Sequence, residues 1–409
     1  FSLAPAHYLN LYKDDLQIER YWNIDKQQTI DIAEDETIHK LDQLLTLSVK
    51  RRLRSDVPVG ISLSGGVDSS SLLYYMNKEQ GKSHAFSAVF PSFEKNEKAF
   101  IDQVSERYSA HVHTIVPNEA ELISDFEKLM YHQEEPLSSS SVYAQYDIFK
   151  LAKEHNIKVL MSGQGADEVL AGYDKYLHWF LQELVSRNKF IDSSFERLRF
   201  GRQNKNFKWG FKNIIASYFP AHVSIALEKK EFNKIIHHPD ISKDMLECLK
   251  GREWEGIHKP IVTKLNDILY FNMMQFGLEE LLRFSDRNSM AFGCESRLPF
   301  LQHDLVSFIF YLPTQLKIQK GHTKFILRKM MEKNLPEKIV WRTDKIAFET
   351  PQKKWMESPF LKAYLQDAKK MLVQEGILRP EALQRKSRAK RSEEHTSELQ
   401  SRVDISYAV

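Results

Sequence analysis

The sequence has little cysteine, no long apolar run and almost no net charge, and each shortage excludes a class of protein. Its two cysteines, Cys248 and Cys294, are too few for a disulfide scaffold and lack the Cys/His spacing of a metal site. We expect both to be small buried hydrophobic residues in a protein of the reducing cytoplasm. No apolar run approaches the roughly 20 residues that span a bilayer. A net charge of +3 over 409 residues gives no support for a nucleic-acid or membrane-surface partner.

The length and composition are those of a globular protein with room for two or more domains, since 42% of the residues are hydrophobic and 28% are charged. The chain has no internal repeat and no low-complexity segment. The basic stretch 385–391 is interpreted as a solvated helix end.

Residues 57–175 alternate between two kinds of segment, which predicts a parallel sheet covered by helices on both faces. Strands are expected at 57–63, 84–90, 111–116 and 157–163. Helices are expected at 69–80, 98–110, 120–133 and 141–155. From 176 to 390 the pattern changes to long aromatic-rich helical stretches such as 263–290 and 322–334, which predicts a mostly helical region packed on the sheet.

The stretch "SLSGGVDSS" at 62–70 joins an expected strand to an expected helix. Unpaired N–H groups at the start of a helix attract anions, and the two glycines allow close approach of a ligand. Asp68 is unexpected in an anion site unless Mg²⁺ binds together with a phosphate. The alternative is an ordinary capped turn. The stretch lacks the lysine and the spacing of the loop that binds β- and γ-phosphates in other nucleotide-binding proteins.

A second glycine-rich turn, "SGQGADE" at 162–168, also follows an expected strand. Ligands of open parallel sheets bind outside the carboxyl ends of the strands. We therefore expect the two turns to line one crevice.

Several blocks together resemble the synthetase domain of glutamine-dependent asparagine synthetases, within the PP-loop ATP pyrophosphatases. The resemblance covers roughly 40–360. Its blocks, in order, are "LSGGVDSS", "LMSGQGADEVLAGY", "DRNSMAFGCESRLPFL", "HTKFILRK" and "WRTDKIAFETPQKKW". It implies an adenine-nucleotide α-hydrolase-like sheet with a helical C-terminal extension.

The resemblance also implies a reaction. ATP would be cleaved between its α- and β-phosphates, aspartate would become an acyl-adenylate, and ammonia would displace AMP to give asparagine. The implied partners are small substrates and a homodimeric copy, with ATP and Mg²⁺ as cofactors and no nucleic acid or membrane.

Site residues carry over position by position from the resemblance. Asp68 and Asp167 match the carboxylates that hold Mg²⁺, and Lys324 matches a lysine that neutralises phosphate charge during catalysis. The positions that match contacts to pyrophosphate or nucleoside are Leu63, Ser64, Gly65, Gly66, Asp68, Ser69, Ser70, Ser162 and Gly163.

Two positions depart from the family pattern. Gln164 stands where a catalytic glutamate is usual, and an amide cannot take up a proton at neutral pH. Either a neighbour such as Asp167, Glu168 or a water carries the proton, or the step needs no base. Ser140 aligns with an arginine that holds the substrate carboxylate, and a serine cannot make that charged, bidentate contact.

The block at 286–301 holds several charges in an apolar stretch: Asp286, Arg287, Glu295 and Arg297. Either a buried ion-pair network or direct substrate contact explains them.

The two ends of the chain are interpreted separately. Residues 1–40 resemble the end of a glutaminase domain and its linker, while 41–390 form the synthetase domain. The tail 391–409 contains "RSEEHTSELQS", which resembles a translated sequencing adapter. The family also has an N-terminal glutaminase domain whose first residue is a nucleophilic cysteine, and we interpret this sequence as a fragment that lacks it.

Three alternatives remain open. The first is the same chemistry on another carboxylate. The second is a nucleotide-binding module without turnover, for which Gln164 is the main argument. The third is a PP-loop enzyme that modifies tRNA, which the balanced charge and the isolated cysteines support poorly.

Overall fold

The computed structural model describes residues 3–13, 15–137, 139–203, 207–248, 251, 258–343 and 350–385. The predicted non-native tail 391–409 and all but the first residue of the basic stretch 385–391 lie outside the described residues.

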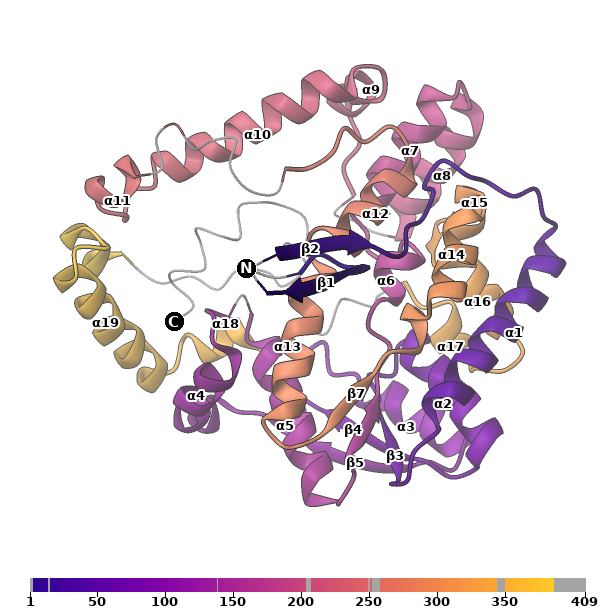
Figure 1. Ribbon diagram of the computed structural model, residues 1–409, viewed down its shortest axis with the longest axis horizontal. Helices are drawn as coiled ribbons and strands as arrows, with labels where there is room; N and C mark the ends of the chain where they lie inside the picture. The colour runs from indigo at the N-terminus through magenta and orange to yellow at the C-terminus, as the bar shows by residue number, and fades with distance from the viewer. Residues whose placement is uncertain are drawn as a thin grey trace.

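A five-stranded parallel sheet lies in the lower part of the molecule as seen in Figure 1, with the strand order β5-β4-β3-β6-β7. The strands are β3 (Val59–Ser62), β4 (His84–Ala88), β5 (His111–Ile115), β6 (Val159–Met161) and β7 (Glu295–Arg297). Every neighbouring pair is parallel. Four of these strands are those predicted from the apolar segments, and β7 is an addition at the sheet edge. The α/β fold class with a parallel sheet flanked by helices is therefore confirmed.

Alternate residues of the strands point to opposite faces and separate two apolar cores. Ile61, Val159 and Met161 belong to one core, whereas Phe86 and Leu160 belong to the other. The helices connecting the strands are α1 (Glu34–Arg52), α2 (Val67–Gln80), α3 (Lys98–Arg107), α4 (Glu119–Gln133), α5 (Ser141–Glu154) and α6 (Ala166–Val169). Helices α2, α3, α4 and α5 agree with the four predicted helices to within a few residues, whereas α1 and α6 were not predicted.

The region after α6 is mostly helical, as predicted. Its elements up to β7 are α7 (Tyr176–Ser186), α8 (Phe190–Gln203), α9 (Phe211–Tyr218), α10 (Pro220–Ile236), α11 (Lys243–Glu247), α12 (Leu265–Met274) and α13 (Leu278–Met290). Those after β7 are η1 (Pro299–Leu301), α14 (His303–Tyr311), α15 (Thr314–Lys317), β8 (Ile318–Gln319), β9 (His322–Thr323), α16 (Phe325–Met331), α17 (Glu337–Val340), α18 (Gln352–Trp355), α19 (Pro359–Gln374) and η2 (Pro380–Gln384). The stretch 263–290 forms two helices because Gly277 interrupts it with φ +107°.

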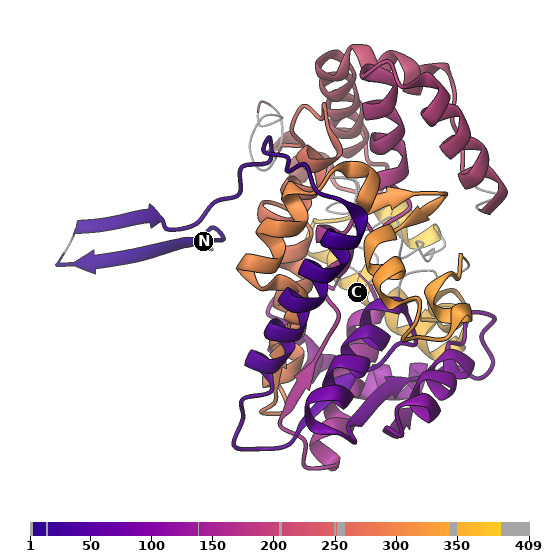
Figure 2. The ribbon, with the colours of Figure 1, turned by 90° about the vertical axis from the view of Figure 1, so that its right-hand side faces the viewer.

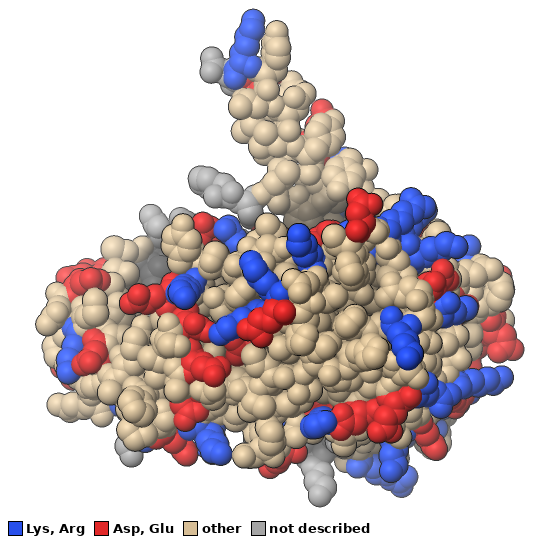
Figure 3. All heavy atoms as spheres, turned by 90° about the horizontal axis from the view of Figure 1, so that it is seen from below, with Lys and Arg blue, Asp and Glu red and all other residues tan. Residues whose placement is uncertain are grey.

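An antiparallel hairpin of β1 (His7–Tyr12) and β2 (Asp15–Arg20) projects from the body of the molecule (Figure 2). The space-filling view shows it as a column with few charged side chains, above a face on which basic and acidic side chains are interspersed (Figure 3). Among the described residues, no helix combines the length and the apolar character needed to cross a bilayer.

Candidate active site

The first glycine-rich turn connects β3 to α2 at the carboxyl edge of the sheet. Gly65 has φ +70°, and a Cβ there would lie 2.9 Å from Cβ of Phe100 on α3. The Ser69 hydroxyl accepts a hydrogen bond from the Ser64 N–H at 3.2 Å, so the turn is held from within. Ser70 is fully buried, and its Oγ has no hydrogen-bond partner within the described residues. The backbone here demands glycine, as the sequence predicts for a loop that a ligand approaches closely.

The second turn connects β6 to α6 and lies against the first. A Cβ on Gly163 would be 3.0 Å from Cβ of Asp68 and 3.3 Å from N of Ser69. Ser162 donates its N–H to the Arg297 carbonyl on β7 at 2.9 Å, which extends the sheet up to this turn. The two predicted turns therefore meet at the carboxyl ends of neighbouring strands, where open α/β sheets bind their ligands.

Lys324 joins the two turns. Its Nζ lies 2.6 Å from Oδ2 of Asp68 in the first turn and 2.6 Å from Oδ1 of Asp167 in the second. The lysine is buried, with 3% of its surface exposed, and it adopts a left-handed backbone conformation just before α16. Burial lowers the pKa of Lys324, but the two carboxylates outweigh this effect and raise its pKa, so the side chain is an ammonium.

Two residues of this centre were not predicted. Gly172 leaves room for the ion pairs, since a Cβ there would lie 2.0 Å from Oδ1 of Asp167 and 2.1 Å from Cε of Lys324. Arg328, one turn after Lys324, is buried and donates from Nε to the Thr323 carbonyl at 2.7 Å. Burial lowers the pKa of Arg328, while Asp68 and Asp167 favour its charge. The available signal was the place of Arg328 in the same block as Lys324, "HTKFILRK".

The remaining predicted residues lie at the same edge. Leu63 is buried, and its carbonyl accepts a hydrogen bond from the Ser87 hydroxyl on β4 at 2.6 Å. Gln164 lies in the second turn, and its buried Oε1 has no hydrogen-bond partner in the described part of the chain. Glu168 is buried in the next turn and accepts a hydrogen bond from Tyr173 at 2.6 Å. Burial, reinforced by Asp167, raises the pKa of Glu168 to about 7.

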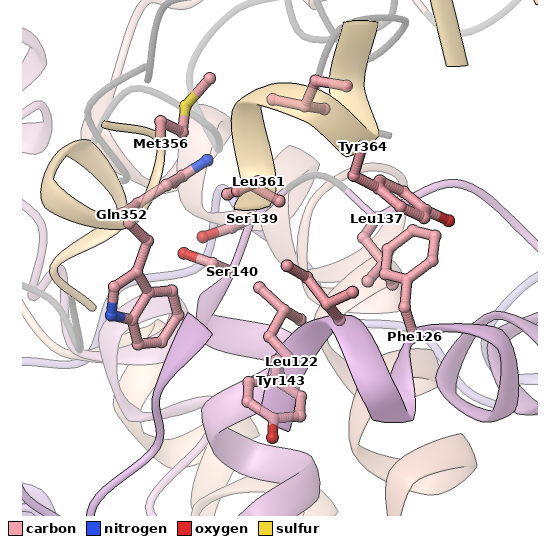
Figure 4. A pocket seen from close by; sticks show the side chains of 13 residues that line it. Leu122, Phe126, Leu137, Ser139, Ser140, Tyr143, Gln352, Met356, Leu361 and Tyr364 are labelled. Atoms are coloured by element: carbon pink, nitrogen blue, oxygen red, sulfur yellow. The ribbon is translucent and has the colours of Figure 1, made fainter. Parts of the chain in front are cut away.

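Ser140 lies away from these charged groups, at the start of α5. Its hydroxyl contacts the Thr350 hydroxyl. Ser139 and Ser140 line an apolar pocket formed with α4, α18 and α19 (Figure 4). The serine that replaces the expected arginine is thus part of an uncharged cavity.

The charged block at 286–301 forms surface ion pairs, so the buried ion-pair network, one of the two explanations considered, is not borne out. Arg287 pairs at 2.7 Å with Glu134, and both side chains are at least 40% exposed. Arg297 pairs at 2.8 Å with the exposed Glu295 and donates to the carbonyls of Arg52 and Arg54. Asp286 is exposed. Helix α13 turns Asp286 and Arg287 outward while Phe284 and Asn288 face the core.

The expectation that both cysteines are buried is half correct. Cys294 is buried, but Cys248 at the end of α11 is exposed, and both are free thiols. Helix α11 buries Leu246 and leaves Cys248, two residues later, on its exposed side.

Comparisons with known proteins identify the family of the chain. The family model described as asparagine synthase matches residues 40–407. Asparagine synthetase 3 (glutamine-hydrolysing) of Bacillus subtilis strain 168 is 28% identical, over 83% of this chain and 53% of that protein. Amidase chyE of Penicillium rubens is 25% identical, over 87% of this chain and 59% of that protein. The chain thus spans about half the length of the curated relatives it matches. Since the family model matches most of the chain, the chain belongs to the asparagine synthase family.

Proposed function

We propose that this chain forms an amide from a carboxylic acid, ammonia and ATP through an acyl-adenylate. The observation that carries the proposal is the Lys324 ammonium between Asp68 and Asp167, at the edge where two glycine-rich turns meet. Anion-binding turns suit a polyphosphate, and a buried cation beside them suits a reaction in which phosphate charge moves.

The proposed reaction has two steps, adenylation of the acid and amide formation. A carboxylate oxygen bonds to the α-phosphorus of ATP while the bond from that phosphorus to the α,β-bridging oxygen breaks, and pyrophosphate leaves with the electron pair. Ammonia then bonds to the carbonyl carbon, AMP leaves with the C–O electron pair, and the nitrogen loses a proton.

The chain's own groups are suited to hold the pyrophosphate and its charge. In this proposal the N–H groups of Gly65 and Gly66 and the hydroxyls of Ser64, Ser69 and Ser70 bind phosphate oxygens. Leu63, Ser162 and Gly163 contact the nucleoside. Lys324 stabilises the charge that develops on the leaving pyrophosphate.

Mg²⁺ fits the donor set. It is usually held by one or two carboxylates together with phosphate oxygens, and Asp68 and Asp167 are two such carboxylates within reach of one ammonium. In the described part of the chain no cluster of three or more His, Cys, Asp or Glu side chains could hold a metal, so phosphate would complete the coordination. When bound, Mg²⁺ would neutralise phosphate charge.

Aspartate is the acceptor in the relatives named asparagine synthetases, and it is our first candidate. A different carboxylic acid is the second, favoured by the uncharged surroundings of Ser140. Dependence on glutamine, the assignment of residues 1–40 to a glutaminase domain, the homodimer and the cytoplasmic location stay predictions.

The test is pyrophosphate release from Mg·ATP with ammonium chloride and a panel of acids, aspartate included. We expect release that depends on one acid and yields its amide. Asp68→Ala should lower that rate by about 100-fold or more, because the variant loses a Mg²⁺ ligand and a partner of Lys324. Asp102→Ala, at an exposed carboxylate on α3, is the matched control. A normal rate in Asp68→Ala would refute the assigned centre.

A further inference from the structure

The described residues that line the pocket beside Ser140 all have uncharged side chains. Leu122 and Phe126 of α4, Tyr143 of α5, and Trp355 and Leu361 from the C-terminal helices form its walls (Figure 4). Its volume is about 60 Å³, several times the space that one water molecule needs.

The chain topology places the pocket at the same sheet edge as the candidate active site. Helix α4 follows β5 and α5 precedes β6, so in a parallel sheet both helices begin at the carboxyl edge. Phe90, just beyond β4, packs edge to face on Trp355 with ring centroids 6.2 Å apart. Neighbouring strands are about 4.8 Å apart, so β5 lies roughly 10 Å from β3 and its turn.

A series of contacts surrounds the first glycine-rich turn. Arg342 pairs with Glu97 at 3.1 Å and covers the ring of Phe100 at 3.8 Å. Phe100 in turn is the residue that a Cβ on Gly65 would strike. The chain topology, rather than these contacts, places the pocket and the turn at one edge of the sheet.

The uncharged lining determines which chemical groups the pocket can bind. A buried ammonium or carboxylate without a charged partner loses its hydration at a cost of several kcal/mol. An apolar group gains about 25 cal/mol for each Å² removed from water. The hydroxyls of Ser139 and Ser140 offer only neutral hydrogen bonds, at one side of the cavity.

We propose that this pocket binds the apolar part of the acceptor acid, so that the chain acts on an aryl or branched-alkyl carboxylic acid rather than on aspartate. The proposal rests on the amide-forming function proposed above and names its substrate class. The acid's carboxylate would then extend from the pocket along the sheet edge toward the α-phosphate.

The test measures binding and turnover separately, with phenylacetate as the probe. Saturation-transfer NMR without nucleotide should detect phenylacetate and not aspartate. Leu122→Trp, which fills the cavity, should weaken phenylacetate binding by about tenfold or more. Leu198→Trp, at an exposed leucine of α8, is the control and should bind normally.

A variant that binds a larger ligand more tightly tests the pocket in a way that misfolding cannot imitate. Leu361→Ala enlarges the cavity and should bind 1-naphthylacetate more tightly than the wild-type chain does. The proposed role of the pocket would be refuted if phenylacetate did not bind, or if Leu122→Trp bound it as tightly as the wild-type chain does.

Asp68→Ala separates the two proposals, because it should bind phenylacetate normally and release no pyrophosphate. Phenylacetate binding that Leu122→Trp abolishes, with no pyrophosphate release for any acid, would support the pocket and refute amide synthesis. Turnover of aspartate that the pocket variants leave unchanged would refute the pocket and support amide synthesis.

Discussion

The Lys324 ammonium is shared by two carboxylates that come from turns almost a hundred residues apart in the chain. One cation between two anions leaves local negative charge, which Arg328 reduces from the next turn of the helix. Such a centre is costly to bury unless every charge has a partner. It therefore indicates a functional site more than a source of stability.

Gln164 tests whether the final proton loss needs a base on the second turn. We expect Gln164→Glu to give ammonia-dependent turnover equal to or higher than the wild-type rate, because a carboxylate can accept the proton that an amide cannot. The measurement is amide formation as a function of pH, with Gln374→Glu at the exposed end of α19 as the control. A complete loss in Gln164→Glu would show that the amide itself is used.

At the scale of the elements, Lys324 at the start of α16 holds the two glycine-rich turns together through its ion pairs. These ion pairs occupy the space that a side chain on Gly172 would fill. We expect Gly172→Ala to lower turnover by about 100-fold, because the new methyl group would displace Asp167 and Lys324 by about an ångström. The control is Gly201→Ala inside α8, where a Cβ meets nothing within 4 Å. That variant should keep its activity and gain up to about 1 kcal/mol in stability.

The two glycine variants are compared by steady-state turnover and by thermal unfolding. Full activity in Gly172→Ala would mean that the ion pairs of Lys324 are dispensable.

The sequence predicts most of the sheet and misses its edge, for a physical reason. The four predicted strands are apolar runs, whereas β7 has only three residues, Glu295–Arg297, and two of them are charged. Its place is set by pairing with β6, which no local pattern encodes. The break at Gly277 between α12 and α13 is likewise a single residue within a continuous helical pattern.

The candidate site also divides into residues that a local sequence pattern reveals and residues that depend on contacts between distant segments. The glycine-rich turns are visible in the sequence because small residues interrupt the pattern directly after strands. Lys324 is found only through the resemblance, since one helical lysine resembles any other. Gly172 and the apolar pocket depend on how distant helices pack, so neither could be predicted.

At the scale of the whole molecule, stability should depend on Asp147, a fully buried carboxyl group on α5. Burial raises the pKa of Asp147 to about 7, whereas an unfolded aspartate has a pKa of about 4. Between pH 4 and 7 the unfolded chain releases this proton and the folded chain keeps it. The contribution of Asp147 to stability is therefore lost as the pH rises through this window.

We expect Asp147→Asn to be more stable than the wild-type chain at pH 8 and to lose most of that advantage at pH 4.5. The difference between the two pH values should be about 1–3 kcal/mol. Urea unfolding at both pH values measures it, with Asp102→Asn as the exposed control. An advantage independent of pH would contradict the raised pKa of Asp147.

The projecting hairpin has a consequence for handling the molecule. Its strands are exposed almost throughout and carry apolar side chains: Tyr8, Leu9, Leu11, Tyr12, Leu16 and Ile18. An isolated two-stranded ribbon is marginally stable, and each of its outer edges can accept a further strand. A concentrated solution of this chain is therefore expected to be limited by edge-to-edge aggregation at the hairpin. A lysine on an outer edge of β1 or β2 is the first change to try for solubility.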